Sequence, residues 1–288
     1  MRRCRNAIAL GAIALVVPLS LNACQTREAA APGASDAAAP PVVTFKGTDF
    51  GYQGPAEIAA GMTELVIQNE GQELHQIQLV KLAEGKTVDD LKAYLGESNG
   101  ASPEWATLLG GPNAAMPGQS ANAFVDLEPG PYAITCDIPS PDGKLHSQKG
   151  MMGSFTVKDE GAPAAAAPEA DLTVAGSDFA FELPSAIGAG SHVFRFENKG
   201  TQAHEAVLIK LQGDATVDEF ASYFGPEAPP GPPPGVGVGG VVALAPAMSQ
   251  EFGATLDAGR YAFVCFLPDP ASGAPHLTLG MQTTFAVP

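Results

Sequence analysis

Residues 132–157 read YAITCDIPSPDGKLHSQKGMMGSFTV, and residues 261–287 read YAFVCFLPDPASGAPHLTLGMQTTFAV. Each stretch opens with an apolar run typical of a β-strand and reaches a cysteine at the end of that run. A loop with proline and glycine follows, then a histidine, a methionine and a second apolar run. In the first stretch these residues are Cys136, His146 and Met151. The second stretch repeats the same order, so the pattern indicates a duplicated unit.

The two stretches belong to a longer internal repeat. A shift of 129 residues matches the copies without a gap from Asp49 to Cys136, and one inserted residue extends the match to Val157. The matched pairs that carry side-chain chemistry are Asp49 and Asp178, Asn69 and Asn198, His75 and His204, Cys136 and Cys265, His146 and His276, and Met151 and Met281. Only His192, of five histidines, has no counterpart.

The amino terminus has the form of a secretion signal. Three arginines precede an apolar run from Ala7 to Leu21, and small residues then lead to Cys24. This ending resembles the lipobox of bacterial lipoproteins, which implies a lipid on Cys24 and a place in the cell envelope, on the periplasmic or another extracytoplasmic face of a membrane. An uncleaved anchor is the alternative, although the apolar run is short for a membrane span.

Two domains of ordinary size fit into 288 residues. Residues 1–24 are the expected signal peptide, and residues 25–41 have the composition of a flexible tether. We expect the domains at residues 42–158 and 171–288, joined by a linker at 159–170. The formal net charge of −16, with no basic cluster, argues against a nucleic acid partner.

Short apolar or alternating runs separated by Gly, Pro and Asn predict an all-β fold of two tandem Greek-key β-sandwiches. The expected strands are at 42–45, 64–68, 76–80, 121–127, 132–136 and 154–157 in the first copy, and at 172–174, 193–197, 206–209, 251–256, 261–266 and 283–287 in the second. Residues 226–240, rich in Pro and Gly, are expected to be an irregular loop.

One short helix is expected inside each copy. Thr87 and Asp90 have the spacing of a capping box, as do Thr216 and Glu219 in the second copy. Gly96 and Gly225 are expected to end the helices, with Leu91, Leu95, Phe220 and Phe224 facing the sandwich. Such a helix either plugs one end of the sandwich, which the pattern favours, or forms a lid near the site.

Soft sulfur combined with imidazole is the ligand chemistry of copper. The upstream histidine, the cysteine at a strand end and the His-x4-Met spacing resemble the cupredoxin family, the plastocyanin and azurin type of copper protein, and the resemblance covers both copies. It implies one type 1-like copper per domain. The implied ligands are His75, Cys136, His146 and Met151, and His204, Cys265, His276 and Met281.

One feature departs from the family pattern. Nine residues separate Cys136 from His146, and ten separate Cys265 from His276, where familiar cupredoxins have only a few. The prolines and Gly143 or Gly273 in these segments predict a rigid excursion that turns back. A disulfide between Cys136 and Cys265 is an alternative, as is a zinc site, although zinc is less suited to a thioether ligand.

The resemblance implies copper binding and one-electron transfer, with a redox protein such as a cytochrome as partner. An enzyme is not expected, because the neighbours of Cys136 and Cys265 are not histidines and no His-x-His is present to hold a catalytic copper. Two alternatives remain open. The protein could handle copper for delivery or tolerance, or it could be an envelope interaction protein with vestigial sites.

Overall fold

The computed structural model describes residues 38–97, 102–159, 165–223 and 230–288. These residues belong to one compact unit, within which we call residues 38–159 the first half and residues 165–288 the second half. The expected signal peptide, most of the tether and Cys24 lie outside the described residues. Within the part of the chain described, no helix is long and apolar enough to cross a membrane.

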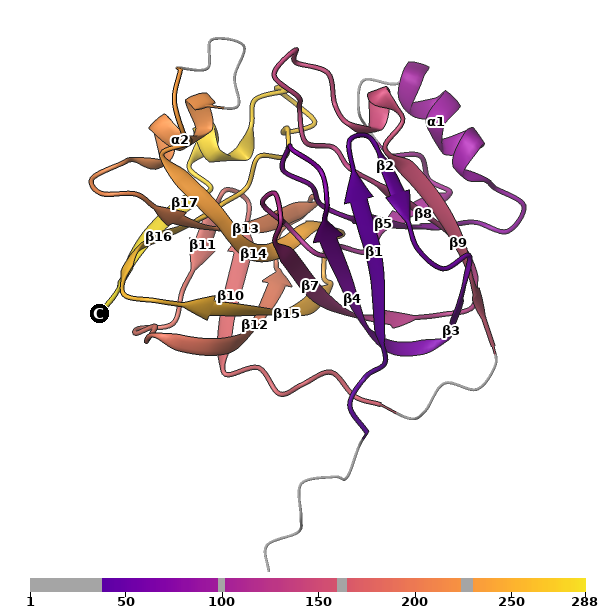
Figure 1. Cartoon of the computed structure of the whole chain (residues 1–288), viewed down its shortest axis with the longest axis horizontal. Coiled ribbons are helices and arrows are strands. Elements are labelled where there is room, and N and C mark those ends of the chain that lie inside the picture. The colour runs from indigo at the N-terminus through magenta and orange to yellow at the C-terminus, as the bar shows by residue number, and fades with distance from the viewer. Residues whose placement is uncertain (1–37, 98–101, 160–164, 224–229) are drawn as a thin grey trace, which may run out of the picture. The chain divides into compact units, whose positions relative to one another are not determined.

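The first half contains nine strands (Figure 1). They are β1 (Val42–Thr48), β2 (Gly51–Gln53), β3 (Glu57–Ala59), β4 (Gly61–Asn69), β5 (Gln78–Leu82), β6 (Ala106–Leu108), β7 (Ser120–Leu127), β8 (Gly130–Thr135) and β9 (Met152–Lys158). One sheet has the order β7-β4-β1-β2 and the facing sheet the order β3-β9-β8-β5-β6. Between them pack apolar side chains from both sheets, Leu65 and Ile67 from one and Leu79 and Ile134 from the other.

The second half repeats this plan with eight strands. They are β10 (Leu172–Ser177), β11 (Ala180–Glu182), β12 (Gly190–Asn198), β13 (His204–Leu211), β14 (Gly235–Leu244), β15 (Ser249–Leu256), β16 (Gly259–Val264) and β17 (Gln282–Val287). The order β11-β10-β12-β15 faces the order β14-β13-β16-β17 across a core that includes Phe194, Phe252 and Phe263. The all-β prediction of two sandwiches is confirmed.

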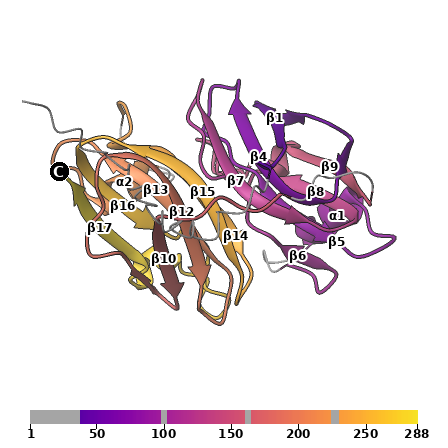
Figure 2. The same cartoon turned by 90° about the horizontal axis from the view of Figure 1, so that it is seen from below.

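The two halves share one sheet. Strand β7 pairs with β15 through Phe124 and Glu251, which joins the two four-stranded sheets into one of eight strands. Figure 2 shows β15 beside β7 where the halves meet. A second contact runs between residues 108–113 and 240–245, where backbone hydrogen bonds link Gly110 to Ala243 and Val242 to Gly111.

Each half also carries a short helix, α1 (Val88–Glu97) and α2 (Val217–Tyr223). The expected capping boxes are present: the Thr87 hydroxyl accepts from the Asp90 backbone N–H, and the Asp90 carboxylate accepts from the Thr87 N–H. Thr216 and Glu219 pair in the same way. Helix α1 continues through Gly96, so the expected stop there is wrong, whereas Phe224 and Gly225 lie outside the described residues.

Helix α1 lies against the outer face of its sheet. Leu91 is buried with Val80, Leu82 and Ala133, whose neighbours along the strands, Leu79 and Ile134 among them, point into the core. Because successive side chains of a strand alternate between faces, the helix covers the side of the sheet away from the sandwich interior. It is therefore neither a plug at the end of the sandwich nor a lid on the site.

The prediction of an irregular loop over residues 226–240 is wrong for its last part, because Gly235–Gly240 belong to β14. The glycines allow β14 to lie very close to β13. A side-chain carbon on Gly240 would lie 2.1 Å from the carbonyl oxygen of Ala206 on β13. A glycine-rich composition thus fits a strand packed tightly against its neighbour, as well as a loop.

Candidate metal centres

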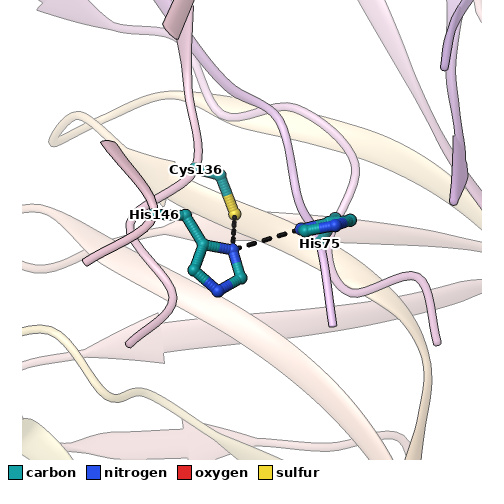
Figure 3. A group of neighbouring side chains, drawn as sticks. All are labelled: His75, Cys136 and His146. Atoms are coloured by element: carbon teal, nitrogen blue, oxygen red, sulfur yellow. Dashed lines mark hydrogen bonds between the residues drawn. The ribbon is translucent and has the colours of Figure 1, made fainter. Parts of the chain in front are cut away.

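The structure brings His75, Cys136 and His146 together in the first half, and His204, Cys265 and His276 in the second. In each group the possible ligand atoms all lie within 4.8 Å of one another, and no other such group of His, Cys, Asp and Glu occurs in the four described segments. The side chains of the first group point toward one another in Figure 3. All six are at most 1% exposed to solvent.

The two groups have nearly the same geometry. In the first half, Nδ1 of His75 lies 3.1 Å from Nδ1 of His146, which lies 3.4 Å from Sγ of Cys136. In the second half, Nδ1 of His204 lies 3.1 Å from Nδ1 of His276, which lies 3.3 Å from Sγ of Cys265. The same atoms therefore converge twice.

The long segments between cysteine and second histidine fold back on themselves. Pro139 and Leu145 form an antiparallel bridge, and Pro268 and Pro275 form the matching one. Gly143 occupies the left-handed region with φ of 78°, which favours glycine at the turn. The extra residues thus project as a small hairpin, as the sequence predicts, and the cysteine and histidine meet at its base.

Backbone hydrogen bonds fix the base of this hairpin. The Ser147 N–H donates to the Cys136 carbonyl at 2.7 Å, and the His146 N–H donates to the Ile138 carbonyl at 2.9 Å. In the second half, Leu277 and His276 donate to Cys265 and Leu267 in the same way. The ligand-bearing loop is therefore held by the chain itself.

Met151 and Met281 are tied to the same loops and are fully buried. The Met151 N–H donates to the His146 carbonyl at 2.9 Å, and the Met151 carbonyl accepts from the Cys136 N–H at 3.2 Å. A side-chain carbon on Gly47 would lie 3.3 Å from Cε of Met151 and 3.4 Å from Cδ2 of His75. The thioether and the first imidazole therefore border the same small space.

The first histidine of each half is positioned by a neighbouring segment. His75 exchanges two backbone hydrogen bonds with Ala115, and His204 pairs with Leu244. Gly71 allows the imidazole to sit beside its acceptor, because a side-chain carbon there would lie 2.6 Å from Nε2 of His75. At Gly200 the corresponding distance to Nε2 of His204 is 2.5 Å. Glycine is required at both positions.

Each imidazole has a partner on its outer nitrogen. Nε2 of His75 lies 2.9 Å from the Asp49 carboxylate, and Nε2 of His146 lies 3.0 Å from that of Glu73. An ionised carboxylate only accepts hydrogen bonds, so it places the imidazole proton on Nε2. The two Nδ1 atoms then direct lone pairs at one another, an arrangement that a bound cation stabilises.

The second half differs in one of these partners. Nε2 of His204 lies 2.7 Å from the Asp178 carboxylate, whereas Nε2 of His276 lies 3.1 Å from the amide oxygen of Gln202. The sequence interpretation missed all four partners. Asp49 and Asp178 were visible as a matched pair, but Glu73 and Gln202 differ between the copies and gave no repeat signal.

An aromatic ring covers the second histidine of each half. The Phe50 ring centroid lies 5.0 Å from that of His146, and the Phe179 centroid lies 5.1 Å from that of His276. Both rings belong to the repeated Asp-Phe dipeptide whose aspartate accepts from the first histidine. One short segment thus orients one imidazole and shields the other from water.

Burial shifts the pKa values of four of these side chains. It raises the pKa of the Cys136 thiol to about 12, raises that of the Cys265 thiol, and lowers those of His75 and His276. The pKa of Asp49 is lowered because hydrogen bonds from Gln72 and His75 outweigh the opposing effect of burial. Without a metal the thiols keep their protons, so metal binding must release one proton per site.

The donor set fits copper. Copper prefers a thiolate, neutral imidazoles and a thioether as ligands, and each group offers all three kinds of donor. The carboxylate oxygens contact the outer Nε2 atoms of the imidazoles instead of the Nδ1 and sulfur atoms that face one another. Cys136 and Cys265 are free thiols, so the disulfide alternative is wrong. Both groups could hold a metal ion.

Comparison with known proteins gives matches among solved structures only. No family model matches the chain, and no curated protein matches it. A reduced auracyanin from the photosynthetic bacterium Roseiflexus castenholzii is 20% identical, over 42% of this chain and 99% of its own, with a TM-score of 0.28. Auracyanin A, a blue copper protein from Chloroflexus aurantiacus, is 18% identical, over 41% of this chain and 99% of its own, with a TM-score of 0.29.

A longer alignment is found with a copper-containing nitrite reductase from Thermus scotoductus. That protein is 13% identical, over 86% of this chain and 61% of its own, with a TM-score of 0.24. The chain is thus similar, at low identity, to auracyanins and to a copper-containing nitrite reductase.

Proposed function

We propose that this protein binds one copper ion in each half and transfers single electrons at a membrane surface outside the cytoplasm, to which a lipid on Cys24 attaches it. The observation that carries the proposal is the duplicated buried group of two Nδ1 atoms and one sulfur, with a methionine bordering each. Copper supplies the one-electron couple when bound.

The residues of the chain supply a fixed cage. Hydrogen bonds through the backbone hold Cys136, His146 and Met151 relative to one another, and Asp49 and Glu73 orient the imidazoles. A cage that keeps its shape in both oxidation states lowers the cost of moving an electron. A carrier needs this property more than it needs space for a substrate.

Burial supports a carrier over an enzyme. The ligand side chains are at most 1% exposed. An electron can reach the site through the surrounding protein, whereas a substrate needs direct access. The acidic chain suits a basic docking surface on a redox protein partner, such as a cytochrome.

The test is copper uptake by the thiol-reduced protein. We expect an intense visible band from thiolate-to-copper charge transfer, reduced by half in Cys136→Ser and in Cys265→Ser, and lost in the double variant. The two single variants control for each other, because each leaves the opposite site intact. Reduced wild-type protein that takes up no Cu(II), or that shows no such band, would contradict the proposal.

A further inference from the structure

The two candidate sites have the same arrangement of two Nδ1 atoms and one sulfur. They differ in the residue that accepts a hydrogen bond from Nε2 of the second histidine. Asp49 and Asp178 occupy equivalent positions and accept from the first histidine of each half. Glu73 and Gln202 also occupy equivalent positions, yet the second histidine meets a carboxylate in one half and an amide in the other. The first site therefore has two carboxylates on its imidazoles, and the second site has one.

Glu73 and Gln202 are held in the same way. The Asn69 side chain donates to the Glu73 carbonyl at 2.7 Å, and the Asn198 side chain donates to the Gln202 carbonyl at 2.9 Å. The distances from the side-chain oxygens to the histidine Nε2 atoms, 3.0 and 3.1 Å, are also nearly equal. The exchange thus changes the charge on the acceptor and leaves its position almost unchanged.

That charge acts on the metal through the imidazole. A carboxylate that accepts the Nε2 proton raises the electron density of the ring and makes its other nitrogen a stronger donor. A stronger donor favours Cu(II) over Cu(I), because Cu(II) carries the greater positive charge. A neutral amide gives the weaker hydrogen bond and the smaller effect.

We propose that the residue accepting the Nε2 proton of the second histidine sets the reduction potential of each copper, so that Glu73 lowers the potential of the first site and Gln202 keeps that of the second site higher than a glutamate would. The inference rests on the proposed function. Copper held by these residues would gain one electron from the redox protein partner, passing from Cu(II) to Cu(I), and the step would need no proton transfer.

Other neighbours also differ between the halves. Tyr52, which lies close to Cys136 and donates to the Gln76 carbonyl, is replaced by Phe181. Gln76 is replaced by Glu205, whose carboxyl group accepts from the Phe266 N–H. The effect of Glu73 and Gln202 is therefore measured by substitution within each site.

The experiment uses single-copper proteins. In Cys265→Ser protein, which keeps the first site, Glu73→Gln is expected to raise the reduction potential measured by spectroelectrochemical titration at one pH. The substitution is well matched to the fold, because Gln202 shows that glutamine reaches the histidine from this loop position. The copper–thiolate band confirms that the site remains loaded in each variant.

The reciprocal change is made in Cys136→Ser protein. The Gln202 amide nitrogen lies 3.4 Å from Asp269, so a glutamate at this position would face another carboxylate. Gln202→Glu is therefore combined with Asp269→Asn and compared with Asp269→Asn alone. A downward shift of the potential is expected, opposite in sign to that of Glu73→Gln.

Glu70→Gln is the matched control in the first site. Glu70 lies on the same loop and pairs with Lys46 at the surface, so its substitution removes an equal charge that no imidazole contacts. A shift in Glu73→Gln no larger than in Glu70→Gln, or shifts of the same sign in both halves, would overturn the inference while the copper band still supports the carrier. Absence of the band in every protein would instead refute the proposed function.

Discussion

Asn69 and Asn198 each organise the segments around a candidate site. The Asn69 amide donates to the carbonyls of Glu73 and Ala115, and its oxygen accepts from the Gly71 N–H at 2.8 Å. Asn198 makes the same three contacts with Gln202, Leu244 and Gly200. One buried side chain thus fixes both the segment that pairs with the first histidine and the loop that faces the second.

Replacing this asparagine is expected to destabilise the fold. Asn69→Ala leaves buried carbonyls and an N–H without partners, which costs about 1–3 kcal/mol of unfolding free energy. Urea unfolding of the metal-free protein measures the loss, with Asn122→Ala, which removes a side chain in contact with Glu64 and Gly253 away from the ligands, as the comparison. An unchanged midpoint for Asn69→Ala would show that the three contacts contribute little.

His192, the histidine without a counterpart, gives stability a pH dependence of its own. Its hydrogen bond to Asp171 raises its pKa above the ordinary 6.5, against the opposing effect of burial. A histidine with a raised folded pKa stabilises the protein fully below pH 6.5, and this contribution is lost as the pH rises through the folded pKa. We expect His192→Gln to remove that part of the pH dependence.

The measurement is the free energy of unfolding of both proteins across this pH range. The difference between wild type and His192→Gln should shrink as the pH rises above 6.5. A difference that stays constant with pH would mean that the ion pair with Asp171 does not contribute. Surface exposure of Asp171 keeps the effect small.

The site residues that could be predicted from the sequence are those that occur in both copies of the repeat. Repeated residues such as His75 and Cys136 were visible because the same spacing of histidine, cysteine and methionine occurs in both copies. Glu73 and Gln202 were not, because a residue that differs between copies looks like any surface position. The two acceptors proposed to set the reduction potentials are therefore the ones that a comparison of the two copies does not identify.

Among the elements, the helices were predicted in position but not in role. The capping boxes mark where α1 and α2 begin, since the side-chain and backbone groups involved are close in sequence. Which face of a sheet receives a helix depends on residues far away in the chain, here Val80 and Ala133. Strand β14 was missed for the same reason, because its pairing with β13 is set by tertiary contact.

Helix α1 is expected to contribute to stability without affecting the metal. Leu91→Ala removes a buried side chain from the outer face of the sheet, which costs about 2–5 kcal/mol. The copper–thiolate band of the folded variant should match that of wild type. Lys92→Ala, at an exposed position of the same helix, is the control and should change neither quantity. A changed band in Leu91→Ala would show that the helix bears on the site.

At the scale of the molecule, side-chain hydrogen bonds join the two halves. Asn113 of the first half donates to the buried Glu205 carboxyl of the second at 3.2 Å, and Gln250 accepts from the Gly111 N–H at 2.7 Å. Burial raises the pKa of Glu205 to about 7. The domain boundaries expected from the sequence remain predictions, whereas the contacts between the halves were beyond what a single repeat could indicate.

Copper bound in one half is therefore expected to stabilise the other. In Cys136→Ser protein only the second half binds copper, while Trp105, the single tryptophan, reports on the first half. If the halves unfold together, copper at a hundred times its dissociation constant adds about 2.7 kcal/mol to the unfolding free energy measured by tryptophan fluorescence. The double Cys→Ser variant should show no gain. If copper does not change the unfolding transition followed by tryptophan fluorescence, the halves unfold independently.

The contact between the halves also has a symmetry. Pro112 pairs with Val241, its own counterpart in the repeat, and Leu109 pairs with Leu244, the counterpart of Ala115. Each partner thus presents the same patch to the other, as in a twofold homodimer. The present chain has the form of two subunits of such a dimer joined in one polypeptide. In a homodimer both subunits carry the same residue at every position, whereas two copies in one chain can differ, as they do at Glu73 and Gln202.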